Sequence, residues 1–163
     1  MHERIALTGK RGAGRFTLVD DGDVPLVIPY RWSLDTPSRR VEYARAWSAD
    51  FPGGSIRMHV LIAGRYVDHA NGDGLDNRRE NLRPATAGQQ MFNTRKRAGC
   101  SSAFKGVSWD KKTGKWVAYI GGPRTGRRVL GRFTDEIEAA RTYDAAATDL
   151  FGPFARVNFP PAH

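Results

Sequence analysis

Asp68 and His69 are adjacent residues whose side chains could together hydrolyse a phosphate ester. Breaking such a bond requires a water molecule that has lost a proton, and positive charge beside the phosphate and the leaving oxygen. An imidazole can accept the proton, and a carboxylate can bind the cation that supplies the charge. Taken alone the pair is a weak signal, because most Asp-His dipeptides lie in surface turns.

Gln90 could complete a metal site from a helix. Thr86, with Gln89 three residues later, has the spacing of a helix capping box, which predicts a short helix from there to about residue 95. A Gln90 amide oxygen facing Asp68 would add to the protein's share of an octahedral Mg²⁺ shell, and Asn93 lies on the same helical face. We therefore expect Asp68 and Gln90 to bind Mg²⁺ or Mn²⁺.

Two other kinds of metal site are excluded by spacing and composition. A calcium-binding EF-hand loop that began at Asp68 would need acidic or amide residues at its third and fifth positions and Glu at its twelfth. Ala70, Gly72 and Arg79 occupy those positions. Cys100 is the only cysteine, so the chain forms no internal disulfide and no cysteine-based zinc cage.

The elements that must position these residues are short. The run 68–77 is too polar and glycine-rich for a regular element, so residues 66–82 are expected to form a long hairpin loop that returns as a strand near 82–85. Residues 1–57 are expected to form a small β-rich module that uses Trp32, Tyr43 and Trp47 for packing. Its expected strands cover residues 5–7, 15–19, 41–46 and 56–58.

The C-terminal part alternates strands with glycine turns and ends in a helix. Residues 96–103 are small and basic, as in a linker. Three strands are expected at 104–109, 115–120 and 127–133, and Asp135 with Glu138 starts a helix that runs to Phe151. Its apolar stripe is expected to contain Ile137, Ala140, Tyr143, Ala147 and Leu150. The predicted class is α+β, with a hairpin–helix at 58–95 and a three-stranded antiparallel sheet packed on one helix at 104–160.

Basic residues are concentrated in one stretch. The net charge is +9, and residues 95–132 contain eleven Lys or Arg and one acidic residue. This concentration favours nucleic acid as a partner over a solvated basic face or an anionic membrane, because the charges alternate with strand-like runs. No run of 18 apolar residues and no secretory signal is found, so a cytoplasmic location in a bacterial or phage-infected cell is expected.

A set of residues between 57 and 95 resembles the HNH endonuclease family, in the subgroup common in phages and mobile elements. They are His59, Asp68-His69, Asn71-Gly72-Asp73, Leu75-Asp76-Asn77, Glu80-Asn81-Leu82-Arg83, Thr86 and Asn93. The resemblance implies that Asp68 binds the metal, that His69 is the general base, and that Asn81 braces the loop and the base. His59 also matches a family position, where a core or phosphate-contacting role is as plausible as a catalytic one.

The chain departs from the family pattern at one metal ligand. Where the subgroup usually has Gln-Asn, this sequence has Gln89-Gln90, so the ligand is one methylene longer. A displacement of about 1 Å can cost about a hundredfold in rate. The departure implies a weakened, metal-shifted or inactive site, or one in which Asn93 shares the task.

The C-terminal part has a second, independent resemblance, to the DNA-binding domain of plant ethylene-response factors. It is carried by Phe104–Trp109, Lys115–Ile120, Leu130–Phe133, Glu138–Ala147 and Phe151–Pro160. In that family a three-stranded sheet lies in the major groove of DNA. The positions that match DNA contacts are Lys105, Ser108, Lys112, Tyr119, Arg127 and Arg128.

These observations predict a metal-dependent endonuclease that hydrolyses double-stranded DNA, of the homing or phage type. The alternative is a DNA-binding regulator that has kept the scaffold without cutting, and Gln90 is the feature that favours it. An RNA-binding module is less well supported, because the strands lack the paired aromatic platform of common single-strand RNA binders. Whether the protein is a monomer or a homodimer is left open.

Overall fold

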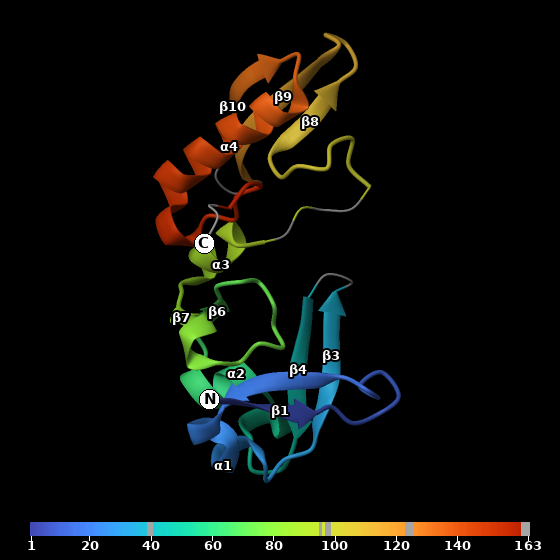
Figure 1. The fold of residues 1–163 in the computed structure, drawn as a ribbon, viewed down its shortest axis with the longest axis vertical. Coiled ribbons are helices and arrows are strands. Elements are labelled where there is room, and N and C mark those ends of the chain that lie inside the picture. The colour runs from blue at the N-terminus through green and yellow to red at the C-terminus, as the bar shows by residue number, and fades with distance from the viewer. Residues whose placement is uncertain (39–40, 95, 97–98, 123–125, 161–163) are drawn as a thin grey trace. The chain divides into compact units, whose positions relative to one another are not determined.

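The computed structural model describes residues 1–38, 41–94, 96, 99–122 and 126–160. By its internal contacts the chain divides into two compact units, Met1–Gln90 and Met91–His163 (Figure 1). The first unit combines small antiparallel sheets with short helices, and the second packs one antiparallel sheet on a helix, which confirms the predicted α+β class. Among the described residues, no helix is both long and apolar enough to span a membrane.

Two small sheets and two short helices make up the start of the first unit. One sheet pairs β1 (His2–Ala6) with β2 (Phe16–Asp20). The other has the order β3-β4-β5 and contains β3 (Trp32–Ser38), β4 (Val41–Trp47) and β5 (Ser55–Arg57). The helices are α1 (Val24–Val27) and α2 (Met58–Ala63). Single 3₁₀ turns lie at Asp21–Asp23, Pro52–Gly54 and Arg79–Asn81.

The predicted strand at 56–58 is wrong at its end, because Met58 begins α2. Met58, Leu61 and Ile62 have the three- and four-residue spacing of a buried helical face, and Met58 and Ile62 belong to the core. Gly64, with φ of 89°, ends the helix. β3 and α1 were not predicted at all.

One apolar core holds the first unit together. Trp32 is 1% exposed, and its Nε1 donates a hydrogen bond to the carbonyl oxygen of Val27, as its predicted packing role requires. Trp47 is 67% exposed, so the same prediction is wrong there. Ala44 and Ala46 occupy the buried side of β4, and the alternation of a strand turns Trp47 to the other side.

A hairpin and a short helix complete this region. β6 (Val67–His69) pairs antiparallel with β7 (Leu82–Pro84). The predicted loop at 66–82 is therefore wrong at its start, because backbone pairing with β7 extends the strand through His69, and the long loop covers residues 70–81. α3 (Ala87–Phe92) follows. Its capping box is confirmed, because Gln89 N donates to Thr86 Oγ1 over 3.3 Å and Thr86 N donates to Gln89 Oε1 over 2.8 Å. The helix ends three residues before the predicted end, and Arg95 lies outside the described residues.

The second unit is a three-stranded antiparallel sheet packed on one helix, as predicted. The sheet has the order β10-β9-β8 and contains β8 (Val107–Asp110), β9 (Lys115–Gly122) and β10 (Gly126–Phe133). The helix is α4 (Glu136–Phe151), and a 3₁₀ turn follows at Gly152–Phe154. The predicted strand start at Phe104 is wrong, because Gly106 has φ of 75°, which an extended strand does not allow.

The predicted start of α4 is confirmed, and its predicted apolar stripe is partly wrong. Asp135 Oδ1 accepts a hydrogen bond of 2.7 Å from Glu138 N. Ile137 and Leu150 are exposed. The residues buried against the sheet are Ala139, Ala140, Tyr143 and Ala147, so mostly small side chains form this face.

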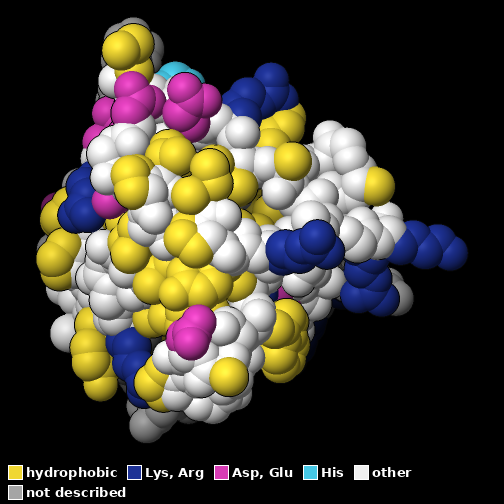
Figure 2. Space-filling model, turned by 90° about the horizontal axis from the view of Figure 1, so that it is seen from below, with side chains coloured by type: hydrophobic (Ala, Val, Ile, Leu, Met, Phe, Trp, Pro, Cys, Tyr) yellow, Lys and Arg dark blue, Asp and Glu magenta, His cyan; other side chains and the backbone are white. Residues whose placement is uncertain are grey.

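Positive charge does not coat the molecule evenly. On the face seen in Figure 2, hydrophobic side chains occupy the middle and most Lys and Arg side chains lie around them. Leu26 and Ile28, at α1, are among the large apolar residues that the first unit exposes. The face in Figure 2 therefore lacks the continuous basic surface that a polyanion would need.

Candidate active site

The β6–β7 hairpin places Asp68 and His69 at the mouth of the long loop. His69 is the last residue of β6 and is 6% exposed, whereas Asp68 is half-buried. Asp68 stands opposite Arg83 in the register, and Arg83 Nη2 lies 2.9 Å from Asp68 Oδ2. The Arg83 guanidinium therefore lies against the carboxylate that is predicted to bind the metal.

Gln90 reaches the same strand from α3. Its Nε2 donates a hydrogen bond of 3.0 Å to the carbonyl oxygen of Val67, the residue before Asp68. A backbone carbonyl only accepts hydrogen bonds, so this contact fixes which end of the amide faces Val67 and leaves Oε1 as the end available to a cation.

The chemistry of this donor set suits Mg²⁺. A carboxylate and an amide oxygen are hard ligands, and Mg²⁺ usually keeps several water molecules beside one or two protein ligands. Within the part of the chain that the structure describes, no three His, Cys, Asp or Glu side chains form a closed metal cage. Asp68 and Gln90 supply the oxygen donor types that Mg²⁺ prefers, and both lie at β6.

His69 is held as a neutral, buried imidazole. Its Nε2 lies 3.2 Å from Asn77 Oδ1, and its ring centroid lies 4.9 Å from that of His59 in an edge-to-face arrangement. Burial lowers the pKa of His69, although the Asn77 hydrogen bond and neighbouring carboxylates oppose this shift. A neutral imidazole at neutral pH is able to accept a proton from water.

Asn81 holds the loop between β6 and β7 together through hydrogen bonds. It is 6% exposed; its Nδ2 donates to the Asp76 carbonyl oxygen over 2.7 Å, and its Oδ1 accepts from Asn71 N over 2.9 Å. Its backbone oxygen accepts from Ala70 N over 2.8 Å. These bonds agree with the loop-bracing half of the role expected for Asn81. A side chain that contacts the His69 ring is that of Asn77, whose Oδ1 accepts in the contact with Nε2.

His59 and Asn93, the two supporting candidates, are both buried. His59 lies on α2, and burial, with smaller contributions from His69 and Arg57, lowers its pKa to about 3. Its ring also packs on Tyr43, at 5.2 Å between centroids. Asn93 follows the end of α3 and belongs to the second unit. His59 thus forms part of the apolar and aromatic wall behind His69.

The second unit presents polar and basic side chains on the face of its sheet opposite α4. Ala118 and Ile120 of β9 are buried, so the alternating Tyr119 points to the other face. The guanidinium carbon of Arg127 lies 3.4 Å from the centroid of the Tyr119 ring. Ser108 pairs with Val117 and shares that face. This face therefore presents the aromatic ring of Tyr119 and the guanidinium of Arg127.

The other candidate DNA contacts have different surroundings. Lys112 is exposed in the turn after β8. Arg128 is exposed and pairs with the buried Ile120. The Lys105 ammonium donates 2.6 Å to the carbonyl oxygen of Phe92, and burial lowers its pKa to about 8. Lys105 therefore also has a structural partner within its unit.

Comparisons with known proteins place the chain in a family. No family model matches the chain. An uncharacterised HNH endonuclease, L560 of Acanthamoeba polyphaga mimivirus, is 30% identical over 158 residues, which cover 91% of this chain and 77% of the viral protein. The chain belongs to the HNH endonuclease family. The resemblance inferred from the residues of the hairpin is confirmed.

This HNH family member also carries a domain similar to plant proteins. Dehydration-responsive element-binding protein 2A of Oryza sativa is 52% identical over 58 residues, or 35% of this chain. Ethylene-responsive transcription factor ERF010 of Arabidopsis thaliana is 46% identical over 68 residues, or 41% of this chain. The chain spans only 21% and 35% of the lengths of these two proteins. The second predicted resemblance is likewise confirmed.

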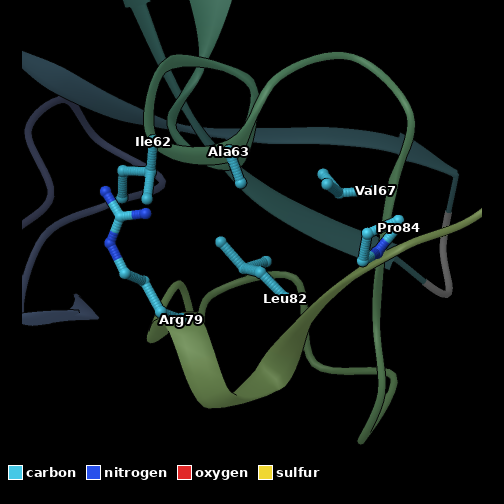
Figure 3. A pocket seen from close by; sticks show the side chains of 6 residues that line it. All are labelled: Ile62, Ala63, Val67, Arg79, Leu82 and Pro84. Carbon is cyan, nitrogen blue, oxygen red and sulfur yellow. The ribbon is translucent and has the colours of Figure 1, made fainter.

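A pocket of about 390 Å³ on this HNH protein lies beside the hairpin without containing the candidate site. It is lined by Ile62, Ala63, Val67, Arg79, Leu82 and Pro84 (Figure 3). The Arg79 guanidinium is paired with Asp23 at 2.7 Å. The remaining lining side chains are apolar, so the pocket offers no nucleophile, base or metal ligand.

Two contributors to the HNH site were not predicted as site residues. Asn77 was quoted only as part of the family motif, and Thr17, which bonds it, lies 60 residues earlier on β2. Asn77 is 0% exposed and Thr17 is also 0% exposed. The only sequence signal for Thr17 was its place in a predicted strand, which does not indicate a polar partner in the loop.

Proposed function

We propose that this HNH protein is a metal-dependent endonuclease that cuts double-stranded DNA. The observation that carries the proposal is the buried imidazole of His69 beside Asp68 at the end of β6, with the Gln90 amide hydrogen-bonded to the same strand. A base, a carboxylate and an amide oxygen on a hairpin and a helix are the parts that phosphodiester hydrolysis requires.

The roles of the residues follow from their chemistry. Asp68 and Gln90 would hold Mg²⁺ or Mn²⁺, which, when bound, stabilises negative charge on the phosphate and on the leaving oxygen. His69 removes the proton from the attacking water. Asn81 keeps the loop closed around this strand end. We expect products with 3′-hydroxyl and 5′-phosphate ends, and one cut strand per site and event.

The second unit is proposed to hold the DNA. Its sheet places Arg127, Tyr119 and Ser108 on the face opposite α4, and the stretch 95–132, with eleven basic residues and one acidic residue, accounts for the positive net charge of the chain. Arg and polar side chains on a sheet can contact phosphates and base edges in a groove. A homing or phage-type role in a bacterial or phage-infected cell is part of the same proposal.

The test is incubation of the purified chain with supercoiled plasmid in Mg²⁺, Mn²⁺ or EDTA, beside His69→Ala. We expect metal-dependent nicking that His69→Ala reduces by about a hundredfold or more, while a gel shift with the same DNA persists. Gln90→Ala should raise the metal concentration required for half-maximal cutting, and Gln90→Asn tests whether the shorter amide binds metal better.

A second candidate function is DNA binding without cleavage. The longer Gln90 side chain at the ligand position is the observation that favours it, because a ligand displaced by about 1 Å can cost about a hundredfold in rate. An intact plasmid under every metal, with an unchanged gel shift, would establish this function and contradict the nuclease. Cutting restored by Gln90→Asn would then locate the defect at this ligand.

A further inference from the structure

A chain of buried hydrogen bonds joins β2 to the ring of His69. Thr17 Oγ1 lies 2.6 Å from the Leu75 carbonyl oxygen and 2.7 Å from Asn77 Nδ2. Asn77 Oδ1 lies 3.2 Å from His69 Nε2. Thr17 and Asn77 are both 0% exposed, so their polar groups depend on partners inside the protein.

The direction of each hydrogen bond can be deduced from the acceptor at the start of the chain. A backbone carbonyl only accepts, so the single proton of the Thr17 hydroxyl lies on the 2.6 Å contact to Leu75. The Thr17 oxygen must then accept from Asn77, which requires the Asn77 NH₂ group on that side. The Asn77 oxygen is therefore the end that faces His69.

This orientation determines the tautomer of His69. An amide oxygen only accepts, so Nε2 of His69 carries the proton in the 3.2 Å contact with Asn77. A neutral imidazole has one protonated and one unprotonated nitrogen, so the lone pair is on Nδ1. If the proton were on Nδ1 instead, two lone pairs would face each other across a buried contact.

The backbone keeps Asn77 in place. Leu18, the residue after Thr17, donates its N–H to the Leu75 oxygen and accepts from Asn77 N, both over 2.9 Å. β2 therefore forms backbone hydrogen bonds to the loop residues on both sides of Asp76. The contacts join residues almost sixty positions apart, so the N-terminal strands are part of the support of the site.

We propose that Asn77 and Thr17 are positioning residues that fix the Nε2-protonated tautomer of His69 and so make Nδ1 the base. The inference rests on the proposed nuclease function for its catalytic meaning. The tautomer itself is a property of the protein without DNA or metal. In a base held by such a contact, loss of the correct tautomer removes the acceptor for the water proton.

The first test reads the tautomer directly. Long-range proton–nitrogen NMR correlations of the full-length, nitrogen-15-labelled protein at about pH 8, where histidine is neutral, distinguish the two tautomers. His69→Ala identifies the His69 signals by their loss. We expect Nε2–H in the wild type. An Nδ1–H tautomer in the wild type would overturn the proposal.

The second test alters the chain of hydrogen bonds with matched variants. Thr17→Val removes the hydroxyl with little change in shape, and Thr17→Ser keeps it. Asn77→Ala removes the acceptor, and Asn77→Asp keeps an acceptor toward His69. We expect Thr17→Val and Asn77→Ala to shift the population toward Nδ1–H, and the two conservative variants to retain Nε2–H. An unchanged tautomer in both disruptive variants would contradict the positioning roles.

Kinetics distinguish positioning from a general loss of structure. For Asn77→Ala we expect kcat to fall by about a hundredfold with KM for DNA little changed, and Asn77→Asp to recover part of the loss. Equal losses in Asn77→Ala and Asn77→Asp would count against the proposal. If Asn77→Ala fails to fold, the wild-type spectrum and the Thr17→Val and Thr17→Ser pair still decide it. A wild type with the Nε2–H tautomer that cuts no DNA would refute the nuclease function alone.

Discussion

The two units of this protein surround their candidate functional residues with different kinds of buried side chain. In the first unit the site residues are surrounded by buried polar groups, such as Thr17, Asn77 and Asn81, whose partners come from distant parts of the chain. In the second unit the sheet lies on a helix face of mostly small residues, Ala139, Ala140 and Ala147 with Tyr143. Buried polar networks specify orientation, whereas close packing of small side chains specifies distance. Under the proposed function, the first unit must orient a base and so needs the polar network, whereas the second must only present a sheet face, for which close packing is enough.

Of the changes that test this comparison, substitution of two glycines is expected to have the largest effect on stability. A Cβ on Gly106 would lie 1.9 Å from Tyr143 Cδ2, and a Cβ on Gly74 would lie 2.2 Å from the Glu42 carbonyl oxygen and 2.6 Å from the Tyr43 ring. Each change to Ala should cost its own unit about 3 kcal/mol or more of unfolding free energy. Hydrogen exchange read by mass spectrometry should show the loss in one unit only.

Gly114→Ala is the matched control for that pair. Gly114 has φ of 62° and nothing within 4 Å of its added Cβ, so only the backbone conformation opposes the change. We expect a cost of about 1 kcal/mol. Faster exchange in both units for either Gly74→Ala or Gly106→Ala would show that the units do not unfold separately.

A second, smaller effect is expected on the unfolding free energy at acidic pH. Burial lowers the pKa of His59 to about 3, so the unfolded chain binds more protons than the folded one as pH falls below the ordinary value of 6.5. The contribution of neutral His59 to the unfolding free energy is therefore fully present above pH 6.5. It is lost as pH falls toward the folded pKa, by up to about 1.4 kcal/mol per pH unit for one group. The lowered pKa of His69 acts with the same sign.

His59→Phe should reduce this acid sensitivity. The change keeps an aromatic ring beside Tyr43 and removes the group that titrates. Urea unfolding between about pH 7 and about pH 5 should give a shallower pH slope than in the wild type. His2→Phe, on the exposed start of β1, is the control and should keep the wild-type slope. Equal slopes in all three proteins would show that His59 is not buried in its neutral form.

The parts of the fold that were predicted correctly from the sequence are determined by residues that are close together in the chain. The capping pairs Thr86–Gln89 and Asp135–Glu138 are local, and both were found. The long polar loop that follows His69 was likewise signalled by residue types within a few positions. Local hydrogen bonding and turn chemistry need no knowledge of the rest of the fold.

The parts that were missed depend on contacts across the chain. Alternation could not tell that Trp47 lies on the open face of β4, because the burial of Ala44 and Ala46 decides it. Several asparagines in the motif could have bonded His69, and only the pairing of β2 with the loop selects Asn77. Thr17 carried no polar signal, since its partners lie about sixty residues away.

A third prediction tests the displayed sheet. Arg127→Ala removes the guanidinium stacked on Tyr119, and we expect DNA affinity to fall several-fold and the salt dependence of log K to decrease by about one phosphate contact. Arg141→Ala removes the same charge from an exposed position on α4 and should leave that salt dependence unchanged. Fluorescence anisotropy over a range of salt concentrations measures both. Equal effects of the two variants would mean that net charge, and not the sheet face, attracts DNA.

The smallest effects are expected at the two helix caps, one in each unit. Asp135→Ala removes the acceptor for Glu138 N and should cost the second unit about 1 kcal/mol, whereas Asp135→Asn should keep most of the cap. Thr86→Ala removes the acceptor for Gln89 N at the start of the six-residue α3, which carries Gln90. Because fraying there displaces a proposed metal ligand without opening the core, cleavage should fall by no more than about fivefold while the unfolding free energy hardly changes. Plasmid nicking and thermal unfolding of Thr86→Ala and Thr86→Ser would show whether the loss of an exposed helix cap in the first unit reduces cleavage at the proposed site.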